Sequence, residues 1–175
     1  MSAVKKVRGG VSVRLEAEEA ALVRALMEQL LELLGQDAPG PGDELAAVGI
    51  SDRTAPPDDP VLARLFPDAY QEDERAAGEF RRYTEMGLRD GKREAARTVL
   101  KTLERGREAV LDEEEAQIWL RALNDVRLAL GTRLDITEEW YEEAAELDPR
   151  DPRAPMFAAY DWLTMLQESL VRAVW

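Results

Sequence analysis

Carboxylates at helical spacing are the first residues in this sequence whose types could do chemistry. The segment "EEWYEEAAE" carries five glutamates on or beside one helical face: Glu138, Glu139, Glu142, Glu143 and Glu146. Carboxylate oxygens are the ligands that Mg²⁺ and Mn²⁺ prefer. All-helical nucleotide pyrophosphatases pair an E-x-x-E motif with a later E-x-x-D motif, and Glu139-x-x-Glu142 has no such later partner here. The pattern therefore favours a solvated acidic face, and an enzyme with a carboxylate-bound metal is the lesser alternative.

The sequence contains no cysteine and no histidine. Without cysteine there is no disulfide, thiol catalysis, iron–sulfur ligation or thiol redox switch in these residues. Without histidine there is no Ser-His-Asp or Cys-His nucleophile, and almost every structural zinc site is excluded. We therefore expect no catalytic, cofactor-binding or metal-binding residue.

A row of basic residues is the second candidate for chemistry. Residues 81–107 contain nine Lys or Arg and four Asp or Glu, in a chain whose net charge is −13. Five cations recur at four-residue steps and drift by about 40° per step on a 3.6-residue helix. They could contact phosphates or an acidic partner, or neutralise the protein's own acidic helices. The candidates for partner binding are this basic row, Arg89, Arg93, Arg97, Lys101 and Arg105, together with Trp175.

Polar residues also interrupt an apolar helix in "LDEEEAQIWLRALNDVRLALGTRL". This polar seam consists of Arg121, Asn124, Asp125 and Arg127. Arg121 and Asp125 are four residues apart and can pair across one turn. We interpret the seam as structural, fixing how neighbouring helices pack, because buried polar networks satisfy other polar groups; a ligand-binding role stays open.

These residues must be positioned by a mainly α fold. We expect one domain over 1–175, a helical bundle of about six helices with a small antiparallel β-sheet. Valines alternating around Gly9-Gly10 predict a hairpin of strands 3–8 and 11–15, and a third strand is expected near 107–111. Apolar periodicity predicts helices over Ala17–Leu34, Val61–Phe66, Glu72–Arg89, Lys92–Arg105, Leu111–Leu134, Ile136–Leu147 and Pro155–Val174. Residues 35–60 are rich in Pro, Gly and Asp, so we expect a long, partly disordered loop with one helical turn near Asp43–Val48.

Local signals set several helix ends. Asp112 and Glu115 have the spacing of a capping box. Thr137 is the expected cap of the next helix, with Ile136 and Tyr141 as its hydrophobic staple. Gly91 is expected to break the chain between two helices.

Core faces follow from the same periodicity. In the helix before Gly91, the expected inward row is Ala76, Phe80, Tyr83 and Gly87. In the last helix, apolar residues on two sides, Leu163 with Leu166 and Trp162 with Met165, predict burial between several helices. Trp175 is expected to pack back on the fold, or else to anchor a partner or a second copy.

Charge and composition bound the location and the partner. Neither a secretory signal nor a bilayer-spanning apolar run is visible, so we expect a cytoplasmic protein without membrane contact. The acidic total repels phosphate backbones and favours a protein partner, while a local basic patch leaves direct nucleic-acid binding open. A homodimer is also open.

Three stretches carry a resemblance to a known family: "DPVLARLFPDAYQEDERAAGEFRRYTEMGLRDGK", "AQIWLRALNDVRLALGTRL" and "YDWLTMLQESLV". They resemble the actinobacterial domain-of-unknown-function family twenty-seventeen, which includes AosR-like oxidative stress regulators. The resemblance implies a transcriptional regulator that engages a stress sigma factor or RNA polymerase. It also implies oxidant sensing through a C-x-x-x-C pair, which this cysteine-free chain cannot have.

We therefore expect a non-enzymatic cytoplasmic regulator that acts by protein–protein contact with a sigma factor or RNA polymerase. The family's genomic association with an adaptor of the Clp protease gives an alternative, an accessory or adaptor protein in Clp-type regulated proteolysis.

Overall fold

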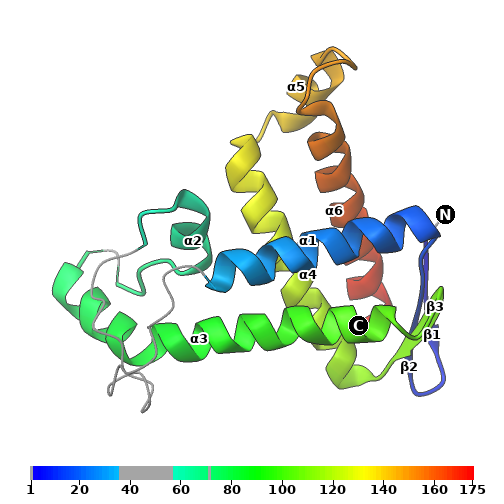
Figure 1. The fold of residues 1–175 in the computed structure, drawn as a ribbon, viewed down its shortest axis with the longest axis horizontal. Helices are drawn as coiled ribbons and strands as arrows, with labels where there is room; N and C mark the ends of the chain where they lie inside the picture. Colours follow the sequence, from blue (N-terminus) through cyan, green and yellow to red (C-terminus); the bar gives the residue numbers. More distant parts are fainter. Residues whose placement is uncertain (1, 36–56, 71) are drawn as a thin grey trace.

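The computed structural model describes residues 2–35, 57–70 and 72–175, and these fold as a mainly α protein with a small sheet (Figure 1). The predicted fold class is confirmed. The elements along the described chain are β1 (Ala3–Val7), β2 (Gly10–Arg14), α1 (Ala17–Gly35), α2 (Pro60–Leu65), α3 (Glu74–Leu103), β3 (Glu108–Leu111), α4 (Glu113–Leu134), α5 (Trp140–Glu146) and α6 (Ala154–Val174). The helical turn expected at Asp43–Val48 lies outside the described residues. Within the described part of the chain, no helix combines the length and apolar character needed to cross a membrane.

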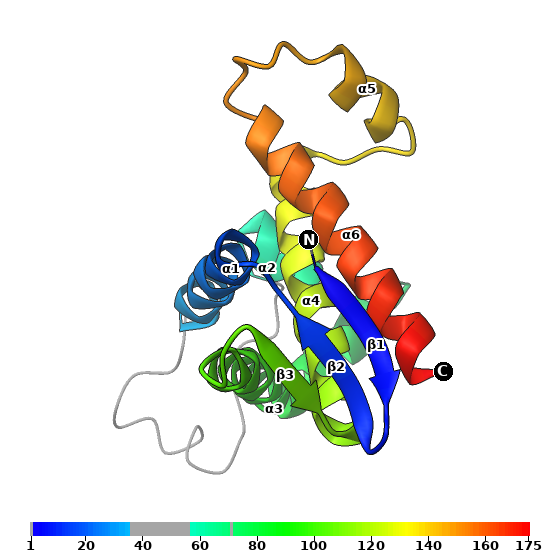
Figure 2. The same ribbon diagram turned by 90° about the vertical axis from the view of Figure 1, so that its right-hand side faces the viewer.

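The sheet is antiparallel with β2 in the middle, in the order β1-β2-β3, as the sequence predicts. Gly9 turns the hairpin with a φ of 89°, a conformation that glycine adopts without strain. Val11, Val13 and Leu111 face inward and are buried. Figure 2 shows α6 along the β1 side of the sheet and α3 along the β3 side.

Helix α4 is the centre of the core and contacts α1, α2, α3 and α6. Its N-terminus carries the predicted capping box, because Asp112 accepts from the Glu115 amide at 2.8 Å and Glu115 accepts from the Asp112 amide at 3.1 Å. Trp119 is 1% exposed, and its indole Nε1 donates to Thr102 Oγ1 of α3 at 2.8 Å. Local cap chemistry and apolar periodicity therefore agree with the tertiary structure here.

The predicted break at Gly91 is wrong, because α3 is one continuous helix of 30 residues from Glu74 to Leu103. A glycine inside a helix costs about 1 kcal/mol relative to alanine, and tertiary packing readily offsets that cost. Ala96 and Val99 on the C-terminal side of Gly91 are fully buried, and ion pairs link successive turns on its N-terminal side.

The predicted inward row of α3 is also wrong. Phe80 is 45% exposed, Tyr83 is 62% exposed, and Gly87 faces solvent; only Ala76 is half-buried. The buried residues on this half of the helix are Ala77, Gly78, Arg81, Glu85 and Arg89. The charged side chains of this half of α3 therefore face inward, because they pair with one another and with other segments of the fold.

The N-terminus of α5 also differs from the prediction. Asp135 adopts a left-handed conformation with φ 53° and ends α4, and the Ile136 amide donates back to Gly131 O at 2.9 Å. The next helix therefore begins only at Trp140, and no side chain caps it. Tyr141 is 60% exposed, so it forms no buried staple, and its hydroxyl donates to Asp161 Oδ1.

Helix α6 is buried on one side only. Leu163, Leu166 and Leu170 lie in the core, whereas Trp162 is half-buried and Met165 is 58% exposed. The expected burial of α6 between several helices is therefore wrong for the side that carries Met165.

Candidate interaction surface

A buried row of three charged residues runs along the first half of α3. Glu85 lies between two arginines, with Arg81 Nη1 at 3.7 Å and Arg89 Nη2 at 3.4 Å from its carboxylate oxygens. Each of the three side chains is no more than 5% exposed. We call Arg81, Glu85 and Arg89 the ionic ladder.

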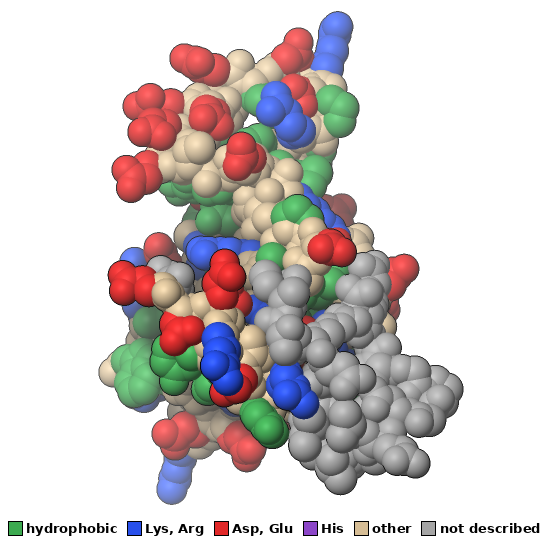
Figure 3. All heavy atoms as spheres, turned by 90° about the vertical axis from the view of Figure 1, so that its left-hand side faces the viewer, with side chains coloured by type: hydrophobic (Ala, Val, Ile, Leu, Met, Phe, Trp, Pro, Cys, Tyr) green, Lys and Arg blue, Asp and Glu red, His purple; other side chains and the backbone are tan. Residues whose placement is uncertain are grey.

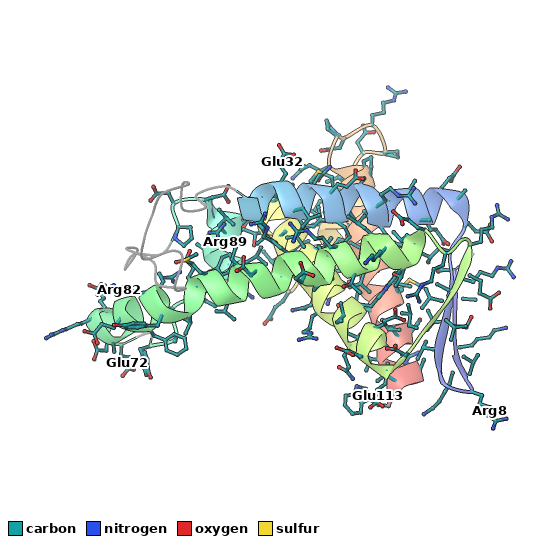
Figure 4. The ribbon with its side chains drawn as sticks, turned by 60° about the horizontal axis from the view of Figure 1, so that its bottom comes forward. Arg8, Glu32, Glu72, Arg82, Arg89 and Glu113 are labelled. Carbon is teal, nitrogen blue, oxygen red and sulfur yellow. The ribbon has the colours of Figure 1, made fainter. Side chains whose placement is uncertain are left out.

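The ionic ladder attaches α3 to segments that are distant in the sequence. Arg81 Nη2 donates to Phe66 O and to Asp68 Oδ1, both at 2.9 Å. Arg89 Nη1 donates to Leu34 O at the end of α1 at 2.7 Å, and its guanidinium lies 5.0 Å from the centre of the Phe66 ring. In Figure 4, Arg89 points from α3 toward the end of α1. Buried charges persist where they are paired, so these contacts explain why the charged row faces inward.

The same half of α3 also exposes large apolar side chains. Phe80 and Tyr83 are joined there by Leu88, which is 51% exposed, and we call these three residues the exposed apolar row. Tyr70 meets Phe80 edge to face with ring centres 6.1 Å apart and is itself 51% exposed. Figure 3 shows hydrophobic side chains lying among charged ones at the end of the molecule where α3 begins. The first half of α3 also extends beyond the end of α1 (Figure 1).

The five members of the basic row do not share one surface. Arg89 is buried in the ionic ladder, and Arg93 is half-buried with an Nε atom that has no hydrogen bond. Arg97 and Lys101 are exposed, and Arg97 donates to Glu94 at 3.0 Å. Within α3, the three steps of about 40° from Arg89 to Lys101 turn the row by about 120°, so its members point in different directions.

Arg105 lies past the end of α3 and is paired locally. It forms an ion pair with Glu115 of the capping box and donates to Val110 O at 3.2 Å. The hydrogen bond from the Arg105 guanidinium to the Glu115 carboxylate lowers the pKa of that carboxyl.

Trp175 is 82% exposed, so it does not pack back on the described fold. In Figure 2 the end of the chain, marked C, lies away from α3.

The polar seam of α4 is divided between two neighbouring helices. Asp125 is buried and accepts from Lys92 Nζ of α3 at 2.7 Å, while Arg121 is exposed and is not within ion-pair distance of it. Burial raises the pKa of the Asp125 carboxyl, with Lys92 opposing that shift. On the other side, Arg127 donates from Nε to Thr164 Oγ1 at 3.1 Å and from Nη1 to Gln167 Oε1 at 2.6 Å, both on α6. Asn124 is exposed beside Arg127.

The acidic segment around α5 is exposed on most of its residues. Over residues 2–35, 57–70 and 72–175, no group of three or more Asp and Glu is arranged to hold a metal ion.

The fold and these surfaces define a mainly α protein whose longest helix buries a row of charged residues and exposes several large apolar side chains. The chain belongs to the family described as domain of unknown function (DUF2017), whose profile matches residues 1–174. Proteins named oxidative stress regulator AosR from Mycobacterium tuberculosis and Mycobacterium bovis are 37% identical to it over 174 residues, covering 90% of this chain and 78% of theirs. A Mycobacterium leprae relative is 38% identical over 89% of this chain and 78% of its own length. No solved structure matches the chain.

Proposed function

We propose that this chain is a non-enzymatic regulatory protein that acts through protein–protein contact. The observation that carries the proposal is the exposed apolar row of Phe80, Tyr83 and Leu88 on a helix that the ionic ladder attaches to the end of α1 and to Phe66. The names of the relatives, oxidative stress regulators, support the regulatory part of the proposal.

Two of the three residues in the exposed apolar row have the spacing of anchors on a helix that fits into a groove. Phe80 and Tyr83 are three residues apart, a step that groove-binding helices use, whereas Leu88 follows Tyr83 by five residues and lies about 140° around the helix from it. Aromatic residues are enriched where proteins bind one another, because a rigid ring buries a large area at a small entropic cost. A helix that is already ordered loses little further entropy on binding, which favours affinity.

Charge along α3 restricts the partner. Before and within its first turns lie exposed acidic residues, Glu72, Asp73, Glu74 and Glu79, opposed by Arg75. Its second half exposes Arg97 and Lys101. A fitting groove is therefore basic beside the start of α3 and acidic beside its end.

The partner we propose is a stress sigma factor or RNA polymerase, bound in the cytoplasm. The net charge of −13 disfavours a phosphate backbone as the main contact, so DNA would be reached through the partner. Since the chain has no cysteine, its regulation would use a signal other than thiol oxidation.

Capture from cytosol with immobilised protein tests this function. Nuclease-treated and untreated extracts are compared, and bound proteins are identified. Recovery of a sigma factor or polymerase subunits that survives nuclease supports direct contact, whereas loss on nuclease treatment assigns the contact to DNA. Recovery of Clp protease components instead favours the adaptor alternative.

Surface variants then locate the contact. Phe80→Ala with Tyr83→Ala should weaken binding of the captured partner at least about tenfold, since both are candidates for interface hot spots. Met165→Ala, an exposed apolar change on α6, is the matched control and should leave affinity unchanged. Charge reversal at Arg97 and Lys101 should weaken binding less. Equal affinity of the Phe80/Tyr83 variant and the control would remove α3 from the interface.

A further inference from the structure

An open cleft is lined by residues of α2, α4 and α6 and of the segment that follows α4. Figure 1 shows that α4 and α6 both lead to the α5 segment. The volume of the cleft is about 370 Å³, which is within the size range of small-molecule sites. The residues that matter for its chemistry are Arg64, Asn124, Arg127, Asp135, Ile136 and Tyr160. Two members of the polar seam, Asn124 and Arg127, thus line one cavity.

Arg127 is held firmly in the wall of this cleft. Its Nε and Nη1 atoms donate to Thr164 and Gln167 of α6, and its guanidinium lies 5.5 Å from the centre of the Tyr160 ring. These contacts fix the plane of the guanidinium and leave Nη2 without a hydrogen-bond partner among the described residues. A guanidinium fixed in this way can receive an anion with little further loss of entropy.

Arg127 forms no ion pair with a carboxylate of the described residues. Its partners are a hydroxyl, an amide and an aromatic ring, and no carboxylate of the described chain lies within 4.0 Å. A half-buried charge of this kind is normally paired. Arg64, at the same cleft, is exposed and likewise has no ion pair among residues 2–35, 57–70 and 72–175. With Asp135 as the single acidic lining residue, the cleft carries a net charge of about +1 in a chain of −13.

We propose that this cleft binds a small organic carboxylate, with one negative charge on an apolar body. A single charge matches the excess of one cation, whereas a phosphate dianion would be repelled by Asp135 and lacks a set of backbone N–H donors there. The apolar body is accommodated by Leu128, Ile136 and Tyr160, which line the same cleft.

The two ends of the cleft orient this ligand. The carboxylate lies at Arg127 and Asn124, which supply guanidinium and amide donors. The other end is formed by the last turn of α4, where the helix dipole is negative and disfavours an anion. Gly131 lines that end, and an added Cβ there would come within 3.3 Å of the Tyr160 ring, so the glycine lets the ring lie close to α4. The apolar body therefore points toward Ile136.

Isothermal titration of the whole chain tests the proposal with benzoate and hexanoate as probes, benzyl alcohol as a neutral probe, and inorganic phosphate. We expect at least one carboxylate to bind with a stoichiometry of one, benzyl alcohol not to bind, and phosphate to bind more weakly. Arg127→Met should weaken binding about tenfold or more, since a hydrogen bond to a charged group is lost. Arg64→Ala should weaken it about threefold, and Arg133→Ala, an exposed arginine of α4 outside this cleft, should not change it.

Several results would overturn the proposal. Failure of both carboxylates to bind the unaltered protein excludes this ligand class, and tighter binding of phosphate or benzyl alcohol assigns the cleft to another. Unchanged affinity in Arg127→Met places the bound probe elsewhere. If Arg127→Met does not fold, Arg64→Ala decides, because its side chain is exposed at the cleft; equal affinity there also overturns the proposal. Because binding is measured on the protein alone, the result does not depend on the partner proposed for α3.

Discussion

Lys92 of α3 and Asp125 of α4 form an ion pair in which only the carboxylate is buried. The Nζ to Oδ1 distance is 2.7 Å, and the Asp125 side chain is 6% exposed whereas that of Lys92 is 23% exposed. This pair joins the two longest helices directly across the core. The pair also holds a carboxylate away from water in the native state, so the contribution of Asp125 to stability depends on pH.

Asp125→Asn should change how stability depends on pH. Burial raises the pKa of Asp125 above its ordinary 3.8, so the native state binds this proton more tightly than the unfolded state does. The contribution of Asp125 to stability is then fully present below 3.8 and decreases as pH rises through the folded-state pKa. The difference in unfolding free energy, unaltered protein minus variant, should therefore be largest in acid and fall toward neutral pH.

Urea unfolding at a series of pH values measures this difference. Asp90→Asn, an exposed carboxylate change on α3, is the control and should give a difference that stays flat across the same range. A difference for Asp125→Asn that grows with pH would mean that the Lys92 contact outweighs burial at this carboxyl.

The ionic ladder should make Glu85 a strong determinant of stability. Glu85→Ala leaves Arg81 and Arg89 buried without their shared carboxylate, and breaking a buried pair in this way costs about 3 kcal/mol or more. Glu94→Ala removes an exposed ion pair with Arg97 on the same helix and should change stability by about 0.5 kcal/mol or less. Chemical denaturation of both variants tests the contrast; similar values would mean that the ladder contributes no more than a surface pair.

The sequence predicts best where the signal is local. The hairpin around Gly9, the third strand and the capping box of Asp112 and Glu115 each depend on residues within a few positions, and all three are confirmed. The apolar residues that recur at three- and four-residue steps in α4, Trp119, Leu123, Val126 and Leu130, all lie in the core.

Prediction fails on α3 because the decisive contacts are distant. Periodicity identifies an apolar row but does not say whether the fold or a partner covers it. The choice of inner face depends on Arg89 reaching Leu34 O, 55 residues away, and on Arg81 reaching Phe66 O, 15 residues away. The four-residue spacing of Arg81, Glu85 and Arg89 was a signal for the ladder, although its burial was not readable from the sequence.

Gly87→Ala and Gly91→Ala should each stabilise the protein. Both glycines are inside the continuous helix α3 and are exposed, and an added Cβ would meet nothing within 4 Å at either position. Each change should therefore raise the unfolding free energy by about 0.5–1 kcal/mol, the helix-propensity difference between the residues. Thermal and urea unfolding measure the gain.

A control separates this effect from general tolerance of alanine. Gly10→Ala should destabilise strongly, because its Cβ would overlap the backbone carbonyl of Leu111 and its φ is 156°. Destabilisation by Gly91→Ala would instead indicate that the helix is interrupted at Gly91.

Thr102→Val should expose the dependence of the core on one side-chain hydrogen bond. Trp119 Nε1 donates to Thr102 Oγ1 at 2.8 Å, and both residues are 1% exposed. Valine has nearly the same shape as threonine, so the variant leaves the buried indole N–H without this acceptor. An unsatisfied buried donor costs about 1–3 kcal/mol. The matched control is Thr98→Val, one turn earlier on α3, where the hydroxyl donates only to Glu94 O at 3.0 Å and the expected change is about 0.5 kcal/mol or less. Urea unfolding of the two variants measures the difference. A cost for Thr102→Val no larger than that for Thr98→Val would mean that the indole finds another acceptor, and that α3 and α4 are held together by apolar packing and the Lys92–Asp125 pair alone.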